Sequence, residues 1–462
     1  MTVRKGFDKL SPAAHGSVPH LLTVKLEKMI YGGDALGRLP DGRAVFVPFG
    51  LPGETVKAKV VEEKRGHLRA ELVEVLEAAP ERITPKCKHF GICGGCHYQH
   101  LAYQSQLEAK TEILRDQLQR IGKIENPPVE PMVAAPSQWN YRNHVQFHLT
   151  AEGKLGYVSL TPLPLSRWER GWSEGLFAVN ECHLPEQPLN ELWPKLEFDP
   201  GLGLERVSLR LGDDNEAMLV LESNSPDLPK LELEANLSVV HLTEGDAVVM
   251  AGDDHVEMTI VGRDSIPPLQ KTFRVSPGSF FQVNSAMAGK MVGYLLDNLP
   301  VTPDTTLLDV YCGVGLFSAF FSPKVKRVIG IESSPSACED YAVNLDESEN
   351  VELYQAPAED VLPYLGKHEG RPGSQEIAIV DPPRAGVGKR ALDGLLARGP
   401  ERIAYVSCDP STLSRDLARL ISGGYRLTKV TPFDMFPQTY SIESISILVV
   451  MYGYTAKHEN VL

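Results

Sequence analysis

Short β-type runs of hydrophobic and polar residues alternate with glycine-containing turns over residues 20–78. Residues 20–78 hold five short runs of this kind, LLTVKLEKMI, YGGDALGRLPDG, RAVFVPFGLPGE, TVKAKVVEEKRG and HLRAELVEVLEAAP, and most of them contain glycine. Alternation with a period of two is typical of strands that bury one face. Five short strands at this spacing predict a small closed β-barrel.

Barrels of this size belong to two functional classes. Those of the OB type often carry oligonucleotides, and others are purely structural. The segment alone does not separate the two. The residues before it, 1–19, are rich in Ser, Pro, Ala and Gly, and we expect them to be a disordered leader.

The pattern changes twice more after the barrel. YQSQLEAKTEILRDQLQRIG predicts an amphipathic helix that ends at Gly122, and residues 129–270 return to β-type runs. From about residue 275, β-type runs alternate with helical ones, which indicates a parallel sheet with crossover helices. The predicted domains are therefore 20–78, a central and mostly antiparallel β domain at 79–274, and a Rossmann-like domain at 275–462. A Pro-rich stretch with two Trp, residues 161–175, reads as an insert of unassigned role.

The composition of this α/β multidomain chain bears on its location in the cell and on its partners. Its 462 residues contain no apolar run near 18 residues, and its first residues lack the apolar core of a secretory signal. We expect a cytoplasmic monomer that does not enter membranes. The net charge of -14 is uneven, because residues 1–150 hold 20 Lys and Arg against 16 Asp and Glu. A positive front part is compatible with contact to nucleic acid.

A glycine turn follows the first strand of the Rossmann-like domain. In LLDVYCGVGLF, Asp309 stands four residues before Gly313, and Glu332 ends the next strand. Glycines let a ligand approach the backbone, and an acid at that strand end is placed to bind ribose hydroxyls. A dinucleotide is one candidate ligand. The motif lacks G-x-G-x-x-G, however, and its Asp and Gly spacing is that of S-adenosylmethionine methyltransferases.

Asp381 begins a second motif, Asp-Pro-Pro-Arg, at the end of a later strand. Related Asp/Asn-Pro-Pro-aromatic motifs hold an amine in aminomethyltransferases. Arg384 stands here in place of the aromatic residue, which disfavours methylation of an amine.

Cys408 follows another strand, and Asp409 and Pro410 after it resemble an N-cap and the first residue of a helix. A helix N-terminus favours the thiolate, and Asp409 opposes it. A buried structural cysteine is the alternative. Cys312 and Cys338 are expected to serve packing only.

A thiolate suits one kind of methyl transfer especially well. C5 of a pyrimidine is a poor nucleophile until a thiolate adds to C6, and a base must later remove the C5 proton so that the thiol can leave. Glu443, just before the closing strand, is a candidate for this base. A glutamate at a strand start is otherwise a surface residue.

Three of the chain's seven cysteines lie within ten residues, in CKHFGICGGC. The cysteine loop, residues 87–96, carries Cys87, Cys93 and Cys96, and Cys182 is the nearest fourth thiol in the sequence. Four thiolates suit zinc or an iron–sulfur cluster. Zinc sites usually contain two C-x2-C pairs, whereas only one is present here. A disulfide is the weakest alternative in a reducing compartment.

Taken together, these motifs resemble the RNA 5-methyluridine methyltransferases, in the branch with a TRAM domain and an iron–sulfur cluster. The likeness covers about residues 20–460 and rests on CKHFGICGGC, FQVN at 281–284, LDVYCGVGLF, DPPRAG, SCDPSTLSRD and MFPQT with the following Glu. It implies that residues 20–78 are a TRAM barrel that binds RNA. It also implies Cys408 as nucleophile and Glu443 as base. The implied contacts of S-adenosylmethionine are Gln282, Tyr311, Glu332 and Asp381, and the implied ligands of a [4Fe-4S] cluster are Cys87, Cys93, Cys96 and Cys182.

One departure and two open choices accompany the resemblance. The family commonly has His two residues before the base, whereas this chain has Ser441. The substrate it implies is structured RNA, with 23S ribosomal RNA favoured and transfer RNA possible. A non-catalytic RNA-binding protein with a relic methyltransferase domain is the other alternative. RNA contacts are expected at Phe280, by stacking, and at residues 142–144, to the backbone.

Overall fold

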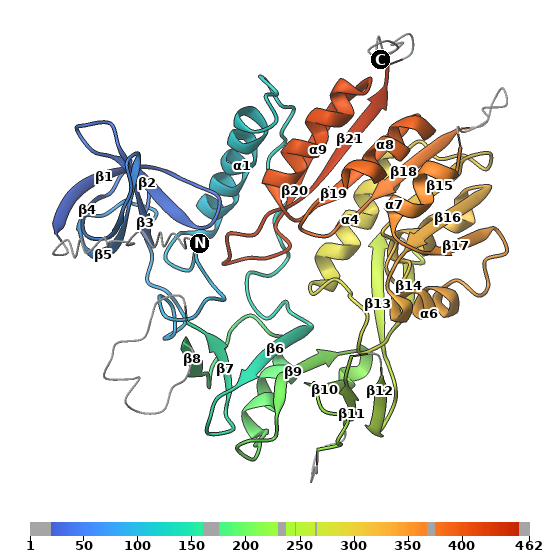
Figure 1. Ribbon diagram of the computed structural model, residues 1–462, viewed down its shortest axis with the longest axis horizontal. Coiled ribbons are helices and arrows are strands. Elements are labelled where there is room, and N and C mark those ends of the chain that lie inside the picture. The colour runs from blue at the N-terminus through green and yellow to red at the C-terminus, as the bar shows by residue number, and fades with distance from the viewer. Residues whose placement is uncertain are drawn as a thin grey trace, which may run out of the picture. The chain divides into compact units, whose positions relative to one another are not determined.

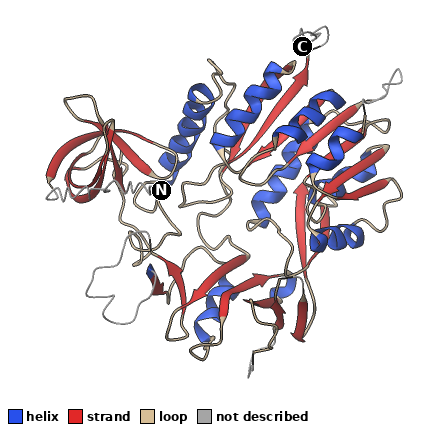
Figure 2. Ribbon diagram, viewed as in Figure 1, coloured by secondary structure: helices blue, strands red, loops and turns tan. Residues whose placement is uncertain are grey.

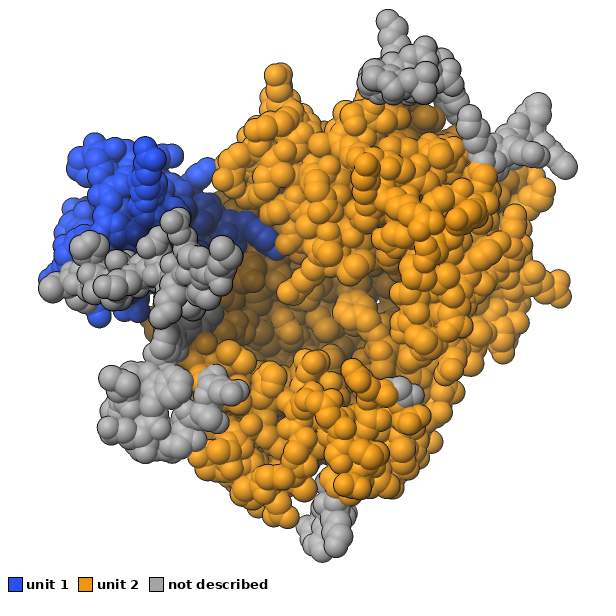
Figure 3. Space-filling model, viewed as in Figure 1, with its two compact units in different colours: residues 1–82 blue, residues 83–462 orange. Residues whose placement is uncertain are grey.

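The computed structural model describes residues 20–159, 175–229, 237–244, 246–263, 266–366 and 375–451. The chain forms two compact units, which meet in the sequence between residues 82 and 83 and are coloured separately in Figure 3. The predicted leader and the insert up to residue 174 lie outside the described residues. Each unit is built around its own sheet structure.

Unit 1 is a closed barrel in which β1 and β4 complete the ring of strands. Val24 and Leu26 point into the barrel while Thr23 and Lys25 stay exposed, which is the alternation seen in the sequence. The predicted barrel is therefore confirmed. In barrel order, its strands are β1 (Leu21–Met29), β2 (Asp34–Arg38), β3 (Ala44–Pro48), β5 (His67–Glu77) and β4 (Thr55–Glu63).

Unit 2 begins with the cysteine loop and helix α1 (Tyr103–Arg120), and a mostly antiparallel sheet follows. Its order is β12-β11-β10-β9-β6-β7-β8, and β10 and β11 run parallel. The β-rich central part expected from the sequence is thus present (Figure 1). Its elements are β6 (His144–Leu149), β7 (Leu155–Val158), β8 (Leu176–Ala178), α3 (Gln187–Leu192), β9 (Leu204–Leu211), β10 (Ala217–Ser223), β11 (Ser238–Leu242) and β12 (Ala247–Ala251).

The second sheet of unit 2 has the order β17-β16-β15-β18-β19-β21-β20. The first five strands in this order are parallel, and β21 is antiparallel to its neighbours β19 and β20. Helices flank these strands (Figure 2). Because the parallel strands share their carboxyl edge, the segments after β15, β16, β18 and β19 converge there. The elements are α4 (Ser285–Asn298), β15 (Thr306–Val310), α5 (Leu316–Phe321), β16 (Arg327–Glu332), α6 (Pro335–Asn344), β17 (Val351–Gln355), α7 (Ala358–Val361), β18 (Glu376–Val380), α8 (Lys389–Arg398), β19 (Arg402–Ser407), α9 (Pro410–Ser422), β20 (Tyr425–Phe433) and β21 (Glu443–Val450).

A hairpin of β13 (Val256–Arg263) and β14 (Leu269–Val275) lies in the chain between the two sheets. Helix α4 packs on it through glycine, because a Cβ on Gly289 would lie 2.2 Å from the carbonyl oxygen of Val261. Ile260 and Phe273 of the hairpin belong to the same hydrophobic core as Phe320 of α5. This packing fixes the segment that follows β14, which leads into the site. Among the described residues, no helix combines the length and apolarity needed to cross a membrane.

Candidate active site and cysteine site

The glycine turn after β15 has the backbone that the sequence predicts for a ligand site. Tyr311, Gly313 and Gly315 have positive φ angles of 63°, 54° and 95°. A Cβ on Gly315 would lie 2.5 Å from the Leu345 side chain, so this glycine is required for packing. At Gly313 the same position is open, which leaves room for a ligand.

Asp309 lies beneath this turn and is fully buried. Its Oδ2 accepts hydrogen bonds from the backbone nitrogen of Ser318 at 3.0 Å and from the Ser318 hydroxyl at 2.6 Å. Burial raises the pKa of Asp309 to about 6, and the bonds from Ser318 oppose that rise. Asp309 therefore holds the first turn of α5 in place instead of facing the cavity.

Glu332 ends β16 and binds the turn from the other side. Its Oε2 accepts from the backbone nitrogen of Gly313 at 3.1 Å, and its Oε1 accepts from the backbone nitrogens of Ser333 and Ser334 at 2.7 Å each. The carboxylate is thus held at the lip of the turn, in the position expected for an acid that binds ribose hydroxyls.

The expected site residues other than Asp309 converge on one cavity of about 930 Å³ within unit 2. This volume suits a cofactor together with part of a substrate. The face of unit 2 seen in Figure 3 is visibly hollowed near its centre. The cavity is lined by Gln282, Tyr311, Gly313, Glu332, Asp381, Arg384, Cys408, Ser441 and Glu443, together with Cys87, Cys93, Cys96 and Cys182.

Cys408 lies between β19 and α9, where the sequence places a helix start. Asp409 caps the helix, since its Oδ1 accepts from the backbone nitrogens of Ser411 at 2.8 Å and Thr412 at 2.9 Å. The thiol is half-buried. Burial raises its pKa to about 12, and the Glu443 carboxyl adds to the rise. Asp409 adds to the rise, as expected from the sequence, and the largest cause is burial.

Glu443 and Asp381 are the acids that face the thiol. Glu443 is buried at the start of β21, and burial, followed by the charge of Asp381, holds its pKa well above the usual range. Burial and then Asp309 raise the pKa of Asp381 to about 7. The Arg384 guanidinium opposes the rise in pKa of both Glu443 and Cys408, but it does not cancel that rise. Such a group of acids is unfavourable until a cation enters the cavity.

The four cysteines of the proposed metal site also face the cavity, from the cysteine loop and from the segment after β8. All four thiols are free, and Cys96 is the most buried. No set of three or more His, Cys, Asp or Glu side chains in the described ranges is arranged to hold a metal ion. Cys312 and Cys338 are buried in the core, as expected for packing residues.

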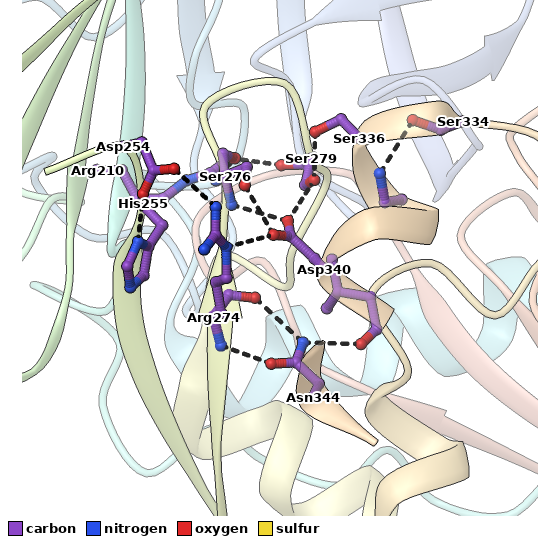
Figure 4. A network of polar contacts seen from close by, with 12 residues as sticks. Arg210, Asp254, His255, Arg274, Ser276, Ser279, Ser334, Ser336, Asp340 and Asn344 are labelled. Atoms are coloured by element: carbon purple, nitrogen blue, oxygen red, sulfur yellow. Dashed lines mark hydrogen bonds and ion pairs between the residues drawn. The ribbon is translucent and has the colours of Figure 1, made fainter. Parts of the chain in front are cut away.

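A polar network that was not predicted from the sequence fixes Ser276 and Ser279, in the segment that leads to Gln282 (Figure 4). Asp340 of α6 accepts from the backbone nitrogen of Ser276 at 2.8 Å and from the Ser279 hydroxyl at 2.6 Å. Arg210 of β9 donates to the carbonyl oxygens of the same two residues at 2.8 and 2.7 Å. The segment before Gln282 is therefore held by helix α6 and by strand β9.

The expected RNA contacts divide into two groups. Phe280 follows the clamped segment, lines the cavity and is 72% exposed, so its ring is free to stack. Asn143 is buried, and its side chain donates to the carbonyl oxygen of Gln282 at 3.0 Å and to the Ser285 hydroxyl at 2.9 Å. Asn143 thus supports the site from within, and the expectation that it contacts RNA is wrong because its amide is already used.

A buried ion pair joins α1 to the segment before Glu443. Lys110 Nζ lies 2.6 Å from Asp434 Oδ1, and both side chains are fully buried. Burial lowers the pKa of Lys110, and the Asp434 carboxylate opposes that. Lys110 also donates to the carbonyl oxygen of Phe436 at 3.0 Å.

We expect Lys110→Met to destabilise unit 2 by about 3–5 kcal/mol, because it leaves Asp434 charged and unpaired in the interior. The measurement is the denaturant midpoint at unchanged slope. The double variant Lys110→Met/Asp434→Leu removes both charges and should recover much of the loss. A single variant within about 0.5 kcal/mol of the parent would contradict a charged pair.

Comparison with known proteins matches these features. Residues 227–450 match the family model "tRNA (Uracil-5-)-methyltransferase", and residues 20–73 match the TRAM domain. An uncharacterized RNA methyltransferase of Aquifex aeolicus is 34% identical over 453 residues, which cover 93% of this chain and 98% of that protein. One from Halalkalibacterium halodurans is 31% identical, over 93% of this chain and 96% of that protein.

A solved structure shares the fold over nearly the whole chain. It is the Pyrococcus abyssi tRNA (uracil-54, C5)-methyltransferase in complex with S-adenosyl-L-homocysteine. The likeness covers 93% of this chain and 100% of that one, with a TM-score of 0.67 and 24% sequence identity.

Proposed function

Because the chain belongs to the TRAM-containing RNA (uracil-5-)-methyltransferases, which use S-adenosylmethionine, we propose that it methylates C5 of a uridine in 23S ribosomal RNA. The observation that carries the proposal is the meeting of Cys408, Glu443 and Glu332 at one cavity. A nucleophile, a base and a ribose-binding acid are what this reaction needs. An RNA substrate also agrees with a cytoplasmic location.

In the proposed reaction, the Cys408 sulfur bonds to C6 of the uracil, and the electrons of the C5–C6 double bond move to form an enolate. S-adenosylmethionine, when bound, would supply the methyl group to C5 and would be left as S-adenosylhomocysteine. Glu443 removes the remaining C5 proton, the double bond re-forms, and the bond between C6 and Cys408 breaks. The uracil must be flipped out of its stack to enter the cavity.

The acids around Cys408 suit a cationic methyl donor. Asp381 and Glu443 raise the pKa of the Cys408 thiol in the protein alone. Tyr311, Gln282 and Asp381 would help to hold S-adenosylmethionine, and its positive charge would offset that of the acids and favour the thiolate. The thiol would then become reactive only when the methyl donor is in place.

The experiment that tests the function measures tritium release from RNA labelled at C5 of uridine, with and without S-adenosylmethionine. Transcripts of 23S ribosomal RNA and of transfer RNA are offered separately. Release that depends on the cofactor and prefers the ribosomal transcript supports the proposal. Preference for transfer RNA would favour the second candidate, a tRNA enzyme, which the name of the matched family and the Pyrococcus abyssi relative suggest. If neither transcript releases tritium, with or without S-adenosylmethionine, the result would favour an RNA-binding protein without this activity.

We also propose a [4Fe-4S] cluster on Cys87, Cys93, Cys96 and Cys182. The four thiols gather at one cavity. Four cysteine thiolates are the usual ligands of a [4Fe-4S] cluster. The Arg142 guanidinium lies near Cys96 and Cys182 and would balance the negative charge of a cluster. Since methyl transfer moves no net electrons, the cluster would be structural.

Protein purified without oxygen should contain about four iron atoms and absorb broadly in the visible range. Cys96→Ser should lose the iron, because it removes the most buried of the four ligands. Cys338→Ser, a matched change at a buried cysteine outside the set, should keep it. One bound zinc and no iron would refute the cluster.

A further inference from the structure

The segment between β20 and Glu443 is anchored by the chain next to the cysteine loop. This segment, residues 434–442, is called the base loop here. The backbone nitrogens of His97 and Tyr98, directly after Cys96, both donate to the carbonyl oxygen of Gln438, at 2.9 and 3.0 Å. The His97 ring also meets the Tyr440 ring edge-on, with centroids 4.5 Å apart.

Gln438 adopts a backbone conformation that needs such support. Its φ is +69°, in the left-handed region that a non-glycine residue rarely occupies, and it is buried. A residue of this kind persists only when its surroundings hold it there. Five residues later, the chain reaches Glu443.

Gln106 of α1 joins the two segments. Its Oε1 accepts from the backbone nitrogen of Gln438 at 3.1 Å, and its Nε2 donates to Gln438 Oε1 at 3.0 Å. The same Nε2 donates to the carbonyl oxygens of Tyr98 at 3.1 Å and Leu101 at 2.9 Å. The buried amide of Gln106 thus binds two segments at once: the chain that follows the cysteine loop, and the base loop.

Cys408 is held by different contacts. It follows β19, and Asp409 fixes the start of α9 behind it. The hydrogen bonds of the Gln106 side chain go to Tyr98, Leu101 and Gln438, so a change at Gln106 should disturb Glu443 before it disturbs Cys408. The two reacting side chains are therefore separable by mutation.

We infer that Gln106 is a positioning residue for proton removal: it couples the end of the cysteine loop to Gln438 and so sets where Glu443 stands. The inference rests on the proposed function, since it assigns Glu443 to the base. The inference also links the cysteine site to the reaction. The residues directly after Cys96 are the ones that hold the base loop. Cys87 supports this link, since its backbone nitrogen donates to Gln99 at 2.9 Å and closes the cysteine loop.

The test is Gln106→Ala, with Gln119→Ala as the matched control. Gln119 lies on the same helix and donates to the carbonyl oxygen of Glu125 at 3.1 Å, but it is exposed and contacts no base-loop residue. Gln106→Ala should slow tritium release about 100-fold, as a misplaced catalytic group does. Methyl transfer should persist, so a methylated covalent protein–RNA adduct should accumulate on a denaturing gel. Gln119→Ala should release tritium like the parent and leave no adduct.

Slower release without any adduct would overturn the inference, and so would release equal to that of Gln119→Ala. Failure of the proposed function looks different, because then the unaltered protein releases no tritium. Should Gln106→Ala not fold, Gln438→Asn decides the matter. Asparagine tolerates the left-handed backbone, but its side chain is too short to accept from Gln106 Nε2, so only the bond from the backbone nitrogen of residue 438 to Gln106 Oε1 remains. The same adduct is expected, and its absence refutes the coupling.

Amide exchange supplies a readout that needs no catalysis. In Cys96→Ser, exchange in a peptide spanning the base loop should rise above that of the parent, because His97 and Tyr98 no longer hold Gln438 firmly. Cys338→Ser should leave that peptide unchanged. Equal protection of the base loop in Cys96→Ser and the parent would show that the cysteine site does not hold it.

Discussion

Replacement of Cys408 by alanine should lower uridine methylation by about 10⁴-fold or more, to the background of the assay. C5 of uracil gains its nucleophilic character only from a bond between sulfur and C6, and Cys408 supplies the thiol at the cavity beside Glu443 and Asp381. Neither of these acids can take its place, since carboxylates are weak nucleophiles toward C6. The measurement is methyl incorporation from labelled S-adenosylmethionine under single-turnover conditions.

Two controls separate chemistry from folding. Cys408→Ser keeps the shape of the side chain, yet it should be equally inactive, because a hydroxyl near neutral pH is far less nucleophilic than a thiolate. Both variants should bind S-adenosylmethionine like the parent, since Glu332 and the glycine turn are untouched. An active Cys408→Ala protein would mean that the methyl acceptor is already nucleophilic, as an amine is, and would remove C5 of uridine as the target.

Much of the site could be predicted from the sequence because its signals are local. The glycine turn, the cap at Asp409 and Pro410, and the barrel strands each depend on residues a few positions apart, and the structure has them all. The convergence of Glu332, Asp381 and Cys408 followed from topology, since all stand after parallel strands of one sheet.

What the sequence did not predict depends on distant contacts. Gln106 and Gln438 are 332 positions apart, and a lone glutamine carries no motif. Asp340 likewise reads as a surface acid on α6, although it is buried among Ser276 and Ser279. The raised pKa of Cys408 could not be predicted either, because its largest cause is burial, which comes from the rest of the fold.

Glu443→Gln should still methylate uridine but fail to release it. Glutamine has nearly the same shape and fills the same buried place at the start of β21, so addition of Cys408 and methyl transfer should proceed. It cannot accept the C5 proton, and the bond between Cys408 and C6 then cannot break by elimination. A methylated protein–RNA adduct, stable on a denaturing gel and formed once per enzyme, is the expected product.

Acid should produce the same adduct in the unaltered protein. Burial and the charge of Asp381 hold the pKa of Glu443 well above its usual range, so the carboxylate is lost as the pH falls through that raised value. Among enzyme molecules that have methylated a uridine, the fraction that stays as adduct should therefore rise as the pH is lowered through that raised value, whereas in Glu443→Gln it should be high at every pH. Glu401→Gln, at the opposite end of β19 and in the same sheet, should behave like the parent. A Glu443→Gln enzyme that turns over freely would assign proton removal to another group, and Asp381 would be the first to test.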